Sequence, residues 1–132
     1  MIQYIFYQLS TGDTRHQAVE TQREDNPQAK SHSAVPTASV FLKMNNLACV
    51  ETSYGDNAYD ALFNAVRRAL GRNDLELRWF QTGLTFRKGI CMGKSRVVVG
   101  INGSSRIGSY MDPDPYRAFM IALVDAINAI SI

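Results

Sequence analysis

The sequence predicts an α+β fold of two pseudo-repeated βββα units, with the helices packed on antiparallel sheets. Strand-like apolar runs are separated by short turn signals, which is typical of hairpins. Two segments carry apolar residues at helical spacing. The order strand, hairpin, helix occurs twice, which an internal duplication explains. The 132 residues are the length of one domain, and we expect units at 1–73 and 74–132.

The first predicted strand covers Ile2–Leu9, which is rich in aromatic and branched residues. The stretch Ser10–Pro36 is different, because it holds many charges, Gly and Pro and very few large apolar residues. Such a stretch buries too little surface to offset its ordering entropy, so we predict a long mobile loop. His16 and His32 lie in it, and we expect no metal role for either.

The first hairpin and helix follow the loop. Residues 38–44 alternate in polarity, Asn45-Asn46 is a two-residue turn signal, and residues 47–52 return as the partner strand. Apolar residues then recur at helical spacing over residues 58–70. Gly71 follows as a helix stop.

The second unit begins with a strand-like run over residues 75–86 that contains Trp79 and Phe80. We predict a Gly- and Lys-rich connector over residues 87–94 and a strand over residues 96–101. Asn102-Gly103 is a strong hairpin signal, and residues 104–109 return as the last strand.

A second helix is predicted to open at Asp112. This residue suits the N-cap, Pro113 suits the first helical position, and Asp114 favours the positive end of the helix dipole. The buried stripe of this helix comprises Phe119, Met120, Leu123, Val124, Ile127 and Ile130.

Charge and cysteine content exclude several classes of protein. The formal net charge is only +2, which is too weak a field to indicate nucleic acid or an anionic membrane as partner. Cys49 and Cys91 lie far apart in no metal-ligand spacing, so neither a zinc site nor a disulfide framework is supported. The apolar start, Met1 to Leu9, is too short to span a membrane. We therefore expect a cytoplasmic protein.

Catalytic templates find no match in the chain. The serines lie in predicted loops and turns, and neither histidine has a nearby carboxylate on a rigid element. Gly100-Ile101-Asn102-Gly103 is a hairpin and not a phosphate-binding loop. Asp112 and Asp114 could be a metal pair, but helix capping accounts for both. We expect no catalytic residue, no cofactor and no metal ion.

Two Gly-containing loops are left as candidate binding sites. One is Tyr54–Asn57 before the first helix, and the other is Ile107–Tyr110 before the second. Backbone N–H groups and the positive dipole end at a helix start favour a bound carboxylate. The alternative is that both loops are simply tight turns.

A nucleic-acid surface is a further alternative. Trp79 and Phe80 would then serve as stacking platforms among basic residues. The basic residues concerned are Arg67, Arg68, Arg72, Arg78, Arg87 and Lys88. A solvated helix end next to core aromatics explains the same pattern.

Several of these segments resemble the C-terminal regulatory domain of 2-isopropylmalate synthase, which citramalate synthase carries in similar form. The matching segments are Ala38–Leu42, Tyr54–Ala65, Val97–Val99, and then Gly108-Ser109-Tyr110 with Asp112-Pro113-Asp114, and finally Ala122–Asn128. Asn57 and Ala58 stand where that family has a second Gly and a Pro. Tyr110 stands where its later loop has a second Gly.

The resemblance implies a non-catalytic regulatory domain that dimerises and binds a small-molecule effector. In that family the effector is the pathway end product, leucine or isoleucine. If such an effector binds, we expect its carboxylate near Gly55, Asp56 and Asn57 or near Gly108 and Tyr110, at the helix starts. We expect its side chain on the apolar residues Tyr59, Leu77 and Phe80. A dimerisation module that has lost its ligand is the alternative.

Partners follow from the same resemblance. We expect a homodimer, and the aromatic run Tyr4, Phe6 and Tyr7 is expected on the face that two amphipathic helices leave uncovered. A separate catalytic barrel is a further expected partner. Whether the chain is an excised domain or a freestanding protein stays open.

Overall fold

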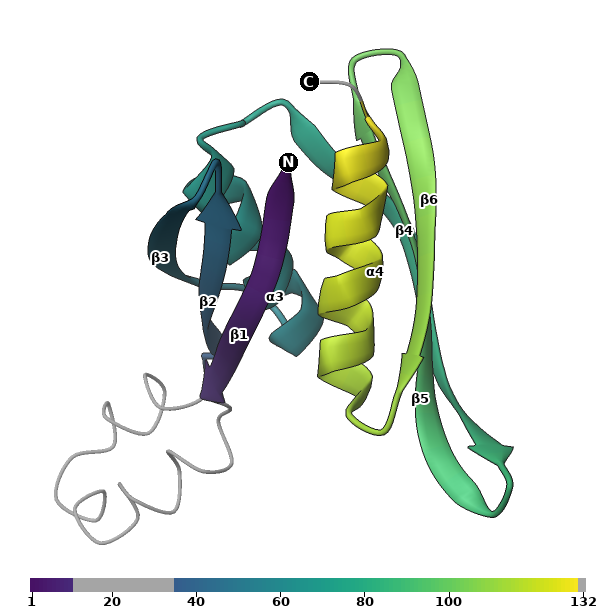
Figure 1. Cartoon of the computed structure of the whole chain (residues 1–132). Coiled ribbons are helices and arrows are strands. Elements are labelled where there is room, and N and C mark those ends of the chain that lie inside the picture. Colours follow the sequence, from purple (N-terminus) through teal and green to yellow (C-terminus); the bar gives the residue numbers. More distant parts are fainter. Residues whose placement is uncertain (11–34, 131–132) are drawn as a thin grey trace, which may run out of the picture.

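The computed structural model of the chain describes residues 1–10 and 35–130, and within them it confirms the predicted α+β fold. Two antiparallel three-stranded sheets each continue into one helix. Figure 1 shows α4 lying between the two sheets, with the start of β1 and the end of α4 at the same end of the molecule. The elements are β1 (Ile2–Ser10), β2 (Thr37–Met44), β3 (Leu47–Tyr54), α3 (Ala58–Leu70), β4 (Leu75–Arg87), β5 (Ile90–Ile101), β6 (Ser104–Asp112) and α4 (Pro115–Ala129).

The two units repeat even in their irregularities. Each first strand pairs with the second, and the second with the third, in strand orders β1-β2-β3 and β4-β5-β6. The register slips between Tyr4 and Phe6 in β1, and between Leu77 and Trp79 in β4. A β-bulge at equivalent places in both units is a feature that a duplication would copy.

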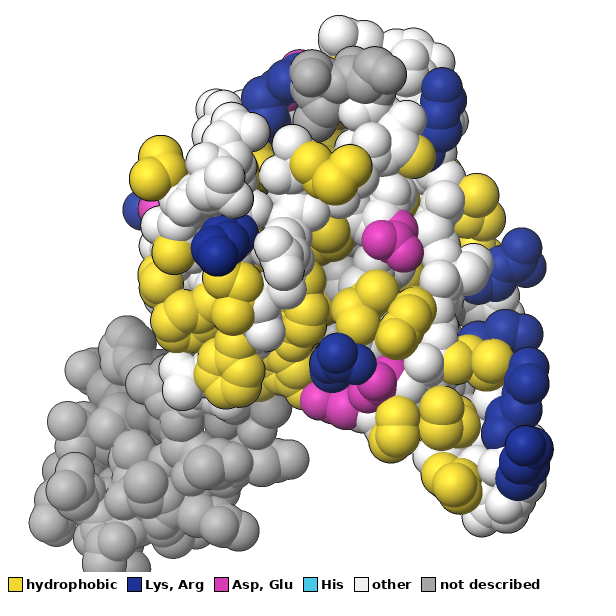
Figure 2. Space-filling view, in the orientation of Figure 1, with side chains coloured by type: hydrophobic (Ala, Val, Ile, Leu, Met, Phe, Trp, Pro, Cys, Tyr) yellow, Lys and Arg dark blue, Asp and Glu magenta, His cyan; other side chains and the backbone are white. Residues whose placement is uncertain are grey.

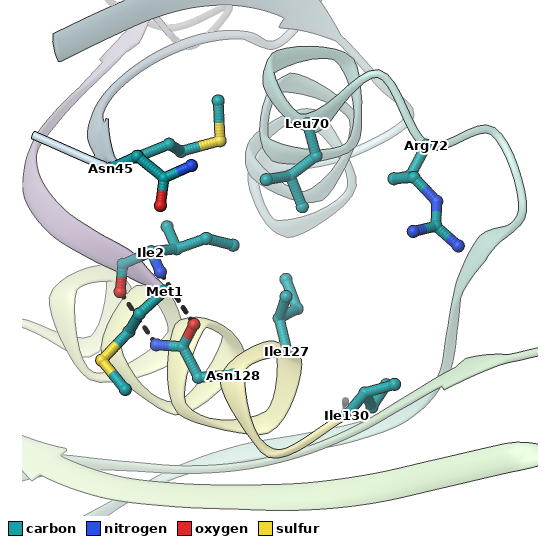
Figure 3. Close-up of a pocket in the computed structure, with 9 residues that line it drawn as sticks. Met1, Ile2, Asn45, Leu70, Arg72, Ile127, Asn128 and Ile130 are labelled. Carbon is teal, nitrogen blue, oxygen red and sulfur yellow. Dashed lines mark hydrogen bonds between the residues drawn. The ribbon is translucent and has the colours of Figure 1, made fainter. Parts of the chain in front are cut away.

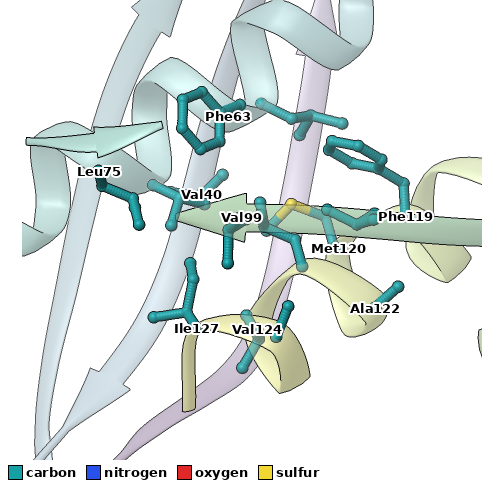
Figure 4. Packing of buried hydrophobic residues seen from close by; sticks show 14 of the residues in the cluster. Val40, Phe63, Leu75, Val99, Phe119, Met120, Ala122, Val124 and Ile127 are labelled. Carbon is teal, nitrogen blue, oxygen red and sulfur yellow. The ribbon is translucent and has the colours of Figure 1, made fainter. Parts of the chain in front are cut away.

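The core lies between the sheets and around the helices. Ala38, Val40 and Leu42 alternate along β2 and are fully buried, because every second residue of a strand points to the same face. The inward residues of β5, one face of α3 and most of the surface of α4 complete the core, as Figure 4 shows for Val99, Phe119 and neighbours. Buried residues of both units thus form one continuous core.

The predicted turns and the first helix are confirmed. Asn45 (φ 52°), Asn46 (φ 68°) and Asn102 (φ 55°) adopt the left-handed conformation that two-residue hairpin turns need. Helix α3 has the predicted bounds. It ends at Gly71, whose φ of 65° places its N–H against the carbonyl oxygens of the last turn.

The predicted connector over residues 87–94 is wrong. Lys88 (φ 52°) and Gly89 (φ 80°) form a third two-residue turn, so β4 runs on to Arg87 and β5 begins at Ile90. Polar residues occur here because the hairpin extends past the helix that covers the rest of the sheet, and exposed strand residues need not be apolar.

The predicted start of the second helix is also wrong, because the helix begins two residues later than predicted. Asp114 is the N-cap, its side chain accepts a hydrogen bond from the Tyr116 N–H, and Pro115 occupies the first helical position. Asp112 ends β6 and accepts a bond from the Asp114 N–H at 3.0 Å. The Asp-Pro pattern occurs twice in succession, so spacing alone does not choose between the two.

Strand β1 belongs to the first unit yet is fixed to the helix of the second. The side chain of Asn128 accepts a hydrogen bond from the Ile2 N–H (2.9 Å) and donates one to the Ile2 carbonyl (2.8 Å). Tyr4 and Tyr7 pack inward against the core, whereas Phe6 is 50% exposed on the opposite face. The aromatic run is therefore split between two faces, which corrects the expectation of one uncovered face.

Part of the predicted loop Ser10–Pro36 lies outside the described residues, as do His16 and His32; Ser10 itself ends β1. In the part of the chain that the structure describes, neither helix is long and apolar enough to cross a membrane.

Candidate functional site

The loop before α3 is held closed by its own hydrogen bonds. The Gly55 N–H donates to the Pro36 carbonyl (3.2 Å), and the Asp56 N–H donates to Oδ2 of Asp60 (3.0 Å). Asn57 is the N-cap, and its Oδ1 accepts from the Asp60 N–H at 2.9 Å. Two of the donors expected to meet a ligand carboxylate are thus already used.

Gly55 has a packing reason to be glycine. A Cβ at this position would lie 2.6 Å from the backbone nitrogen of Ala61 and 2.6 Å from Oδ2 of Asp60. The helix start therefore approaches the loop as closely as the backbone allows. Helix geometry still leaves the N–H groups of Ala58 and Tyr59 without an intrahelical acceptor.

Two open cavities meet at the first turns of α3. The first, of about 540 Å³, is lined by Gly55, Asp56, Asp60, Asn64 and neighbouring residues. The second, of about 520 Å³, is lined by Leu77, Phe80, Asp60, Asn64 and neighbouring residues. Because Asp60 and Asn64 line both, the structure brings the predicted residues 55–57, Leu77 and Phe80 to adjoining sides of one helix start.

Tyr59 lies in an aromatic cluster at the junction of the two units. Its ring centroid is 5.1 Å from those of Tyr116 and Phe119 and 5.4 Å from that of Phe80. Tyr59 and Tyr116 are each the second residue of their helix, so they are equivalent in the duplication. Protein side chains already fill much of the space next to Tyr59.

Gly108 and Tyr110 are not in a loop, contrary to prediction. Both lie within β6, where Gly108 faces Val97 and Tyr110 faces Ser95 across the ladder. A Cβ on Gly108 would lie 2.0 Å from the Ala122 carbonyl oxygen, so this glycine lets α4 pack close to the sheet. Strand β6 continues to Asp112 because α4 begins only at Pro115.

A polar cluster at the start of α4 was not predicted from the sequence. The Tyr7 hydroxyl donates a short hydrogen bond to Oδ2 of Asp114, and the Arg117 guanidinium lies 6.0 Å from the Tyr4 ring centroid. These residues line an open cavity of about 500 Å³. Burial raises the pKa of Tyr7, and the bond to Asp114 and the charge of that carboxylate raise it further. The packing of β1 against α4 of the other unit, which the sequence does not show, brings these residues together.

A fourth cavity lies where both helices end. It measures about 480 Å³ and is lined by Ile2, Leu70, Arg72, Ile127, Asn128 and neighbours, as drawn in Figure 3. The Arg72 guanidinium is engaged by Asp74, with N–O distances of 3.0 and 2.9 Å. The cavity is thus mainly apolar, and its cation is already paired.

The geometry does not favour the alternative of a nucleic-acid surface. Arg68 pairs with Glu51 (3.2 Å), and Arg78 lies 3.4 Å from Glu76. Phe80 packs edge-on against Phe119 instead of facing solvent. Within residues 1–10 and 35–130, no group of three or more His, Cys, Asp or Glu side chains could hold a metal ion.

Comparison with known proteins gives a consistent result. Residues 6–131 match the model of a family described as "LeuA allosteric (dimerisation) domain". Over 128 residues, which are 96% of this chain, the sequence is 27% identical to 2-isopropylmalate synthase of Geobacillus sp. (strain Y412MC10).

A second relative agrees with the first. Over 96 residues, or 73% of this chain, the sequence is 30% identical to 2-isopropylmalate synthase of Nitratidesulfovibrio vulgaris (strain DSM 19637 / Miyazaki F). The matched regions are only 24% and 18% of the relatives' lengths. The chain therefore corresponds to a small part of each relative.

Proposed function

Since the chain belongs to the LeuA allosteric (dimerisation) domain family, we propose that it is a regulatory domain that binds a branched-chain amino acid and works as a homodimer. The domain is proposed to act on a catalytic barrel of the 2-isopropylmalate synthase type, in the same polypeptide or as a partner, and to carry no catalytic residue itself.

The two cavities that meet at the start of α3 are the observation that carries the effector site. Each has a volume in the range of small-molecule sites. The N–H groups of Ala58 and Tyr59 and the positive end of the helix dipole favour an effector carboxylate. Asp60, which lines both cavities, offers a negative charge for an ammonium group, and Leu77 and Phe80 offer apolar surface for a branched side chain.

The sequence-derived site is thereby narrowed to the start of α3 and the neighbouring part of β4. Gly55, Asp56, Asn57 and Tyr59 shape the helix start, while Leu77 and Phe80 supply contacts. Gly108 and Tyr110 are not proposed as contacts of the same effector, because they line neither of the two cavities at the start of α3.

Thermal denaturation with added amino acids tests the effector proposal. Leucine, isoleucine or valine at about a hundredfold excess over its dissociation constant should stabilise the domain by about 2.7 kcal/mol. Alanine and D-leucine are matched controls, since the first lacks the branched side chain and the second inverts the positions of the charged groups. Both should shift the melting temperature much less.

A dimerisation module without an effector is the second candidate. The closed loop at Gly55–Asn57 and the rings packed around Tyr59 favour it, because both fill space that a ligand would need. If none of the three branched amino acids shifts the melting temperature at millimolar concentration while the chain is dimeric, this second function replaces the first.

A further inference from the structure

The hairpin of β4 and β5 extends beyond the helix that covers the rest of its sheet. A Cβ on Gly93 would lie 2.6 Å from the Pro115 Cα, so the first residue of α4 sits directly over Gly93. Gly93 pairs with Leu84, and everything between them and the turn projects past the helix start. Figure 1 shows this projection, residues 84–92, which we call the arm.

The arm presents apolar side chains on the face that continues the core. Phe80 contacts Phe119 of α4 and so marks the core side of β4. Residues four and six positions further along the strand point to the same side, because every second residue of a strand does. Leu84 and Phe86 therefore point to the core side, yet they are 68% and 74% exposed. Large apolar residues gathered on an exposed face indicate an interaction surface.

The arm is also basic. Arg87 and Lys88 stand at its tip, and no acidic residue occurs between Glu76 and Asp112. In Figure 2 the lower right part of the molecule shows hydrophobic side chains towards the body and Lys or Arg along the outer edge. A partner for the arm should therefore combine apolar and acidic groups.

The start of α3 has that combination, at the same end of the molecule. Its open cavity is lined by the apolar Val35, the acidic Asp56 and Asp60, and Tyr54, whose side chain is 68% exposed. In a two-fold symmetric dimer, the arm of one copy can contact the α3 start of its partner while the partner's arm contacts the α3 start of the first copy. Two complementary patches at one end of the molecule can therefore form two identical contacts around a single axis.

We infer that two copies of this chain dimerise by placing the arm of each over the α3 start of the other. Leu84 and Phe86 cover Tyr54 and Val35, and Arg87 lies against Asp56 of the second copy. The contact presupposes the homodimer proposed above and names its surface. A stable interface needs about 800 Å² from each partner, so both arms have to take part in it.

The outward face of the same sheet is the competing surface. Trp79, Val98 and Ile107 form a row across β4, β5 and β6 there. This row is less exposed than the arm residues, and Arg78 lies over the neighbouring Gly100, with its Cζ 2.2 Å from the position of a Cβ. Ile107, 52% exposed, is therefore a matched control for the arm.

Light scattering and sedimentation of the chain, without added amino acid, test the contact. Leu84→Asp and Phe86→Asp should each raise the dimer dissociation constant at least about a hundredfold, as for central interface residues, with unchanged circular dichroism because both sites are exposed. Ile107→Asp should change it less than about threefold. Dimeric arm variants would overturn the arm contact, and a monomeric Ile107→Asp would place the interface on the outward face.

A charge exchange identifies the partner side. Arg87→Glu and Asp56→Arg should each weaken the homodimer, because each places like charges at both contacts. Mixing the two single variants should give a heterodimer tighter than either homodimer, since opposite charges then meet at both contacts. Failure of the mixture to associate would overturn this pairing. A monomeric wild-type chain would overturn both the arm contact and the proposed homodimer. The melting experiment with amino acids would still test the proposed effector site on its own.

Discussion

At the scale of single residues, Gly108 and Gly55 show how the absence of a side chain sets the distance between elements. The carbonyl oxygen of Ala122 occupies the space where a Gly108 side chain would stand, and the backbone of Ala61 does so for Gly55. Neither glycine has a positive φ. Both are therefore needed for close approach of a helix and not for an unusual turn.

Gly108→Ala should destabilise the domain by about 1 to 3 kcal/mol, because the methyl group forces α4 away from the sheet. Denaturant unfolding followed by circular dichroism measures the loss. Gly83→Ala is the matched control in the same sheet, since nothing lies within 4 Å of its Cβ position. Equal stability of the two variants would show that α4 does not rest on β6 as closely as described.

At the scale of elements, the helices differ in how their starts are capped. Asn57 caps α3 through its bond to the Asp60 N–H, and the Asp60 side chain in turn accepts from the Asp56 N–H. Asp114 caps α4 and also accepts the Tyr7 hydroxyl bond. Equivalent positions of the two units thus carry one local cap and one cap that also joins the two units.

Asn57→Ala should cost about 1 kcal/mol of unfolding free energy through loss of the N-cap. Asn57→Asp should retain most of the stability, because a carboxylate accepts the same bond and suits the positive end of the helix dipole. Urea unfolding of the wild type and the two variants measures these differences in unfolding free energy. An alanine variant as stable as the wild type would mean that the Asn57 side chain does not cap α3.

At the scale of the whole molecule, β1 joins the two units through Asn128 at one end and Asp114 at the other. Burial is the main cause of the raised pKa of Tyr7, followed by its bond to Asp114 and the charge of that carboxylate. The pKa values of Tyr4 and Tyr116 are also raised, mainly by burial. The junction between the units therefore favours protonated phenols.

The pH dependence of stability follows from these shifts. Below the unfolded pKa of 10.0 the contribution of Tyr7 is fully present. Above that pH the unfolded chain releases the phenolic proton while the folded chain retains it, so the unfolding free energy falls. Tyr7→Phe should lose about 1.5 kcal/mol at pH 8 and show a smaller further loss on going to pH 11. Parallel pH profiles for the two proteins would contradict this role of Tyr7.

The sequence by itself determined the order of the elements and both types of secondary structure. Alternating polarity, Asn-containing turns and the Gly71 stop act within a few residues, so they can be read from the chain directly. The same local signals placed Gly55–Asn57 at a helix start. The resemblance to the 2-isopropylmalate synthase regulatory domain likewise rested on local segments, and the family match over residues 6–131 agrees with it.

Only the tertiary structure decided where distant residues meet. Strand pairing placed the bulges in β1 and β4 and put Gly108 and Tyr110 in β6 instead of a loop. The packing of β1 on α4 gave Tyr7 its bond to Asp114. The arm past Gly93 exists because α4 begins at Pro115, while the strands run on to the Lys88-Gly89 turn. Such contacts depend on the packing of both units together. Residues that are neighbours in the sequence therefore do not reveal them.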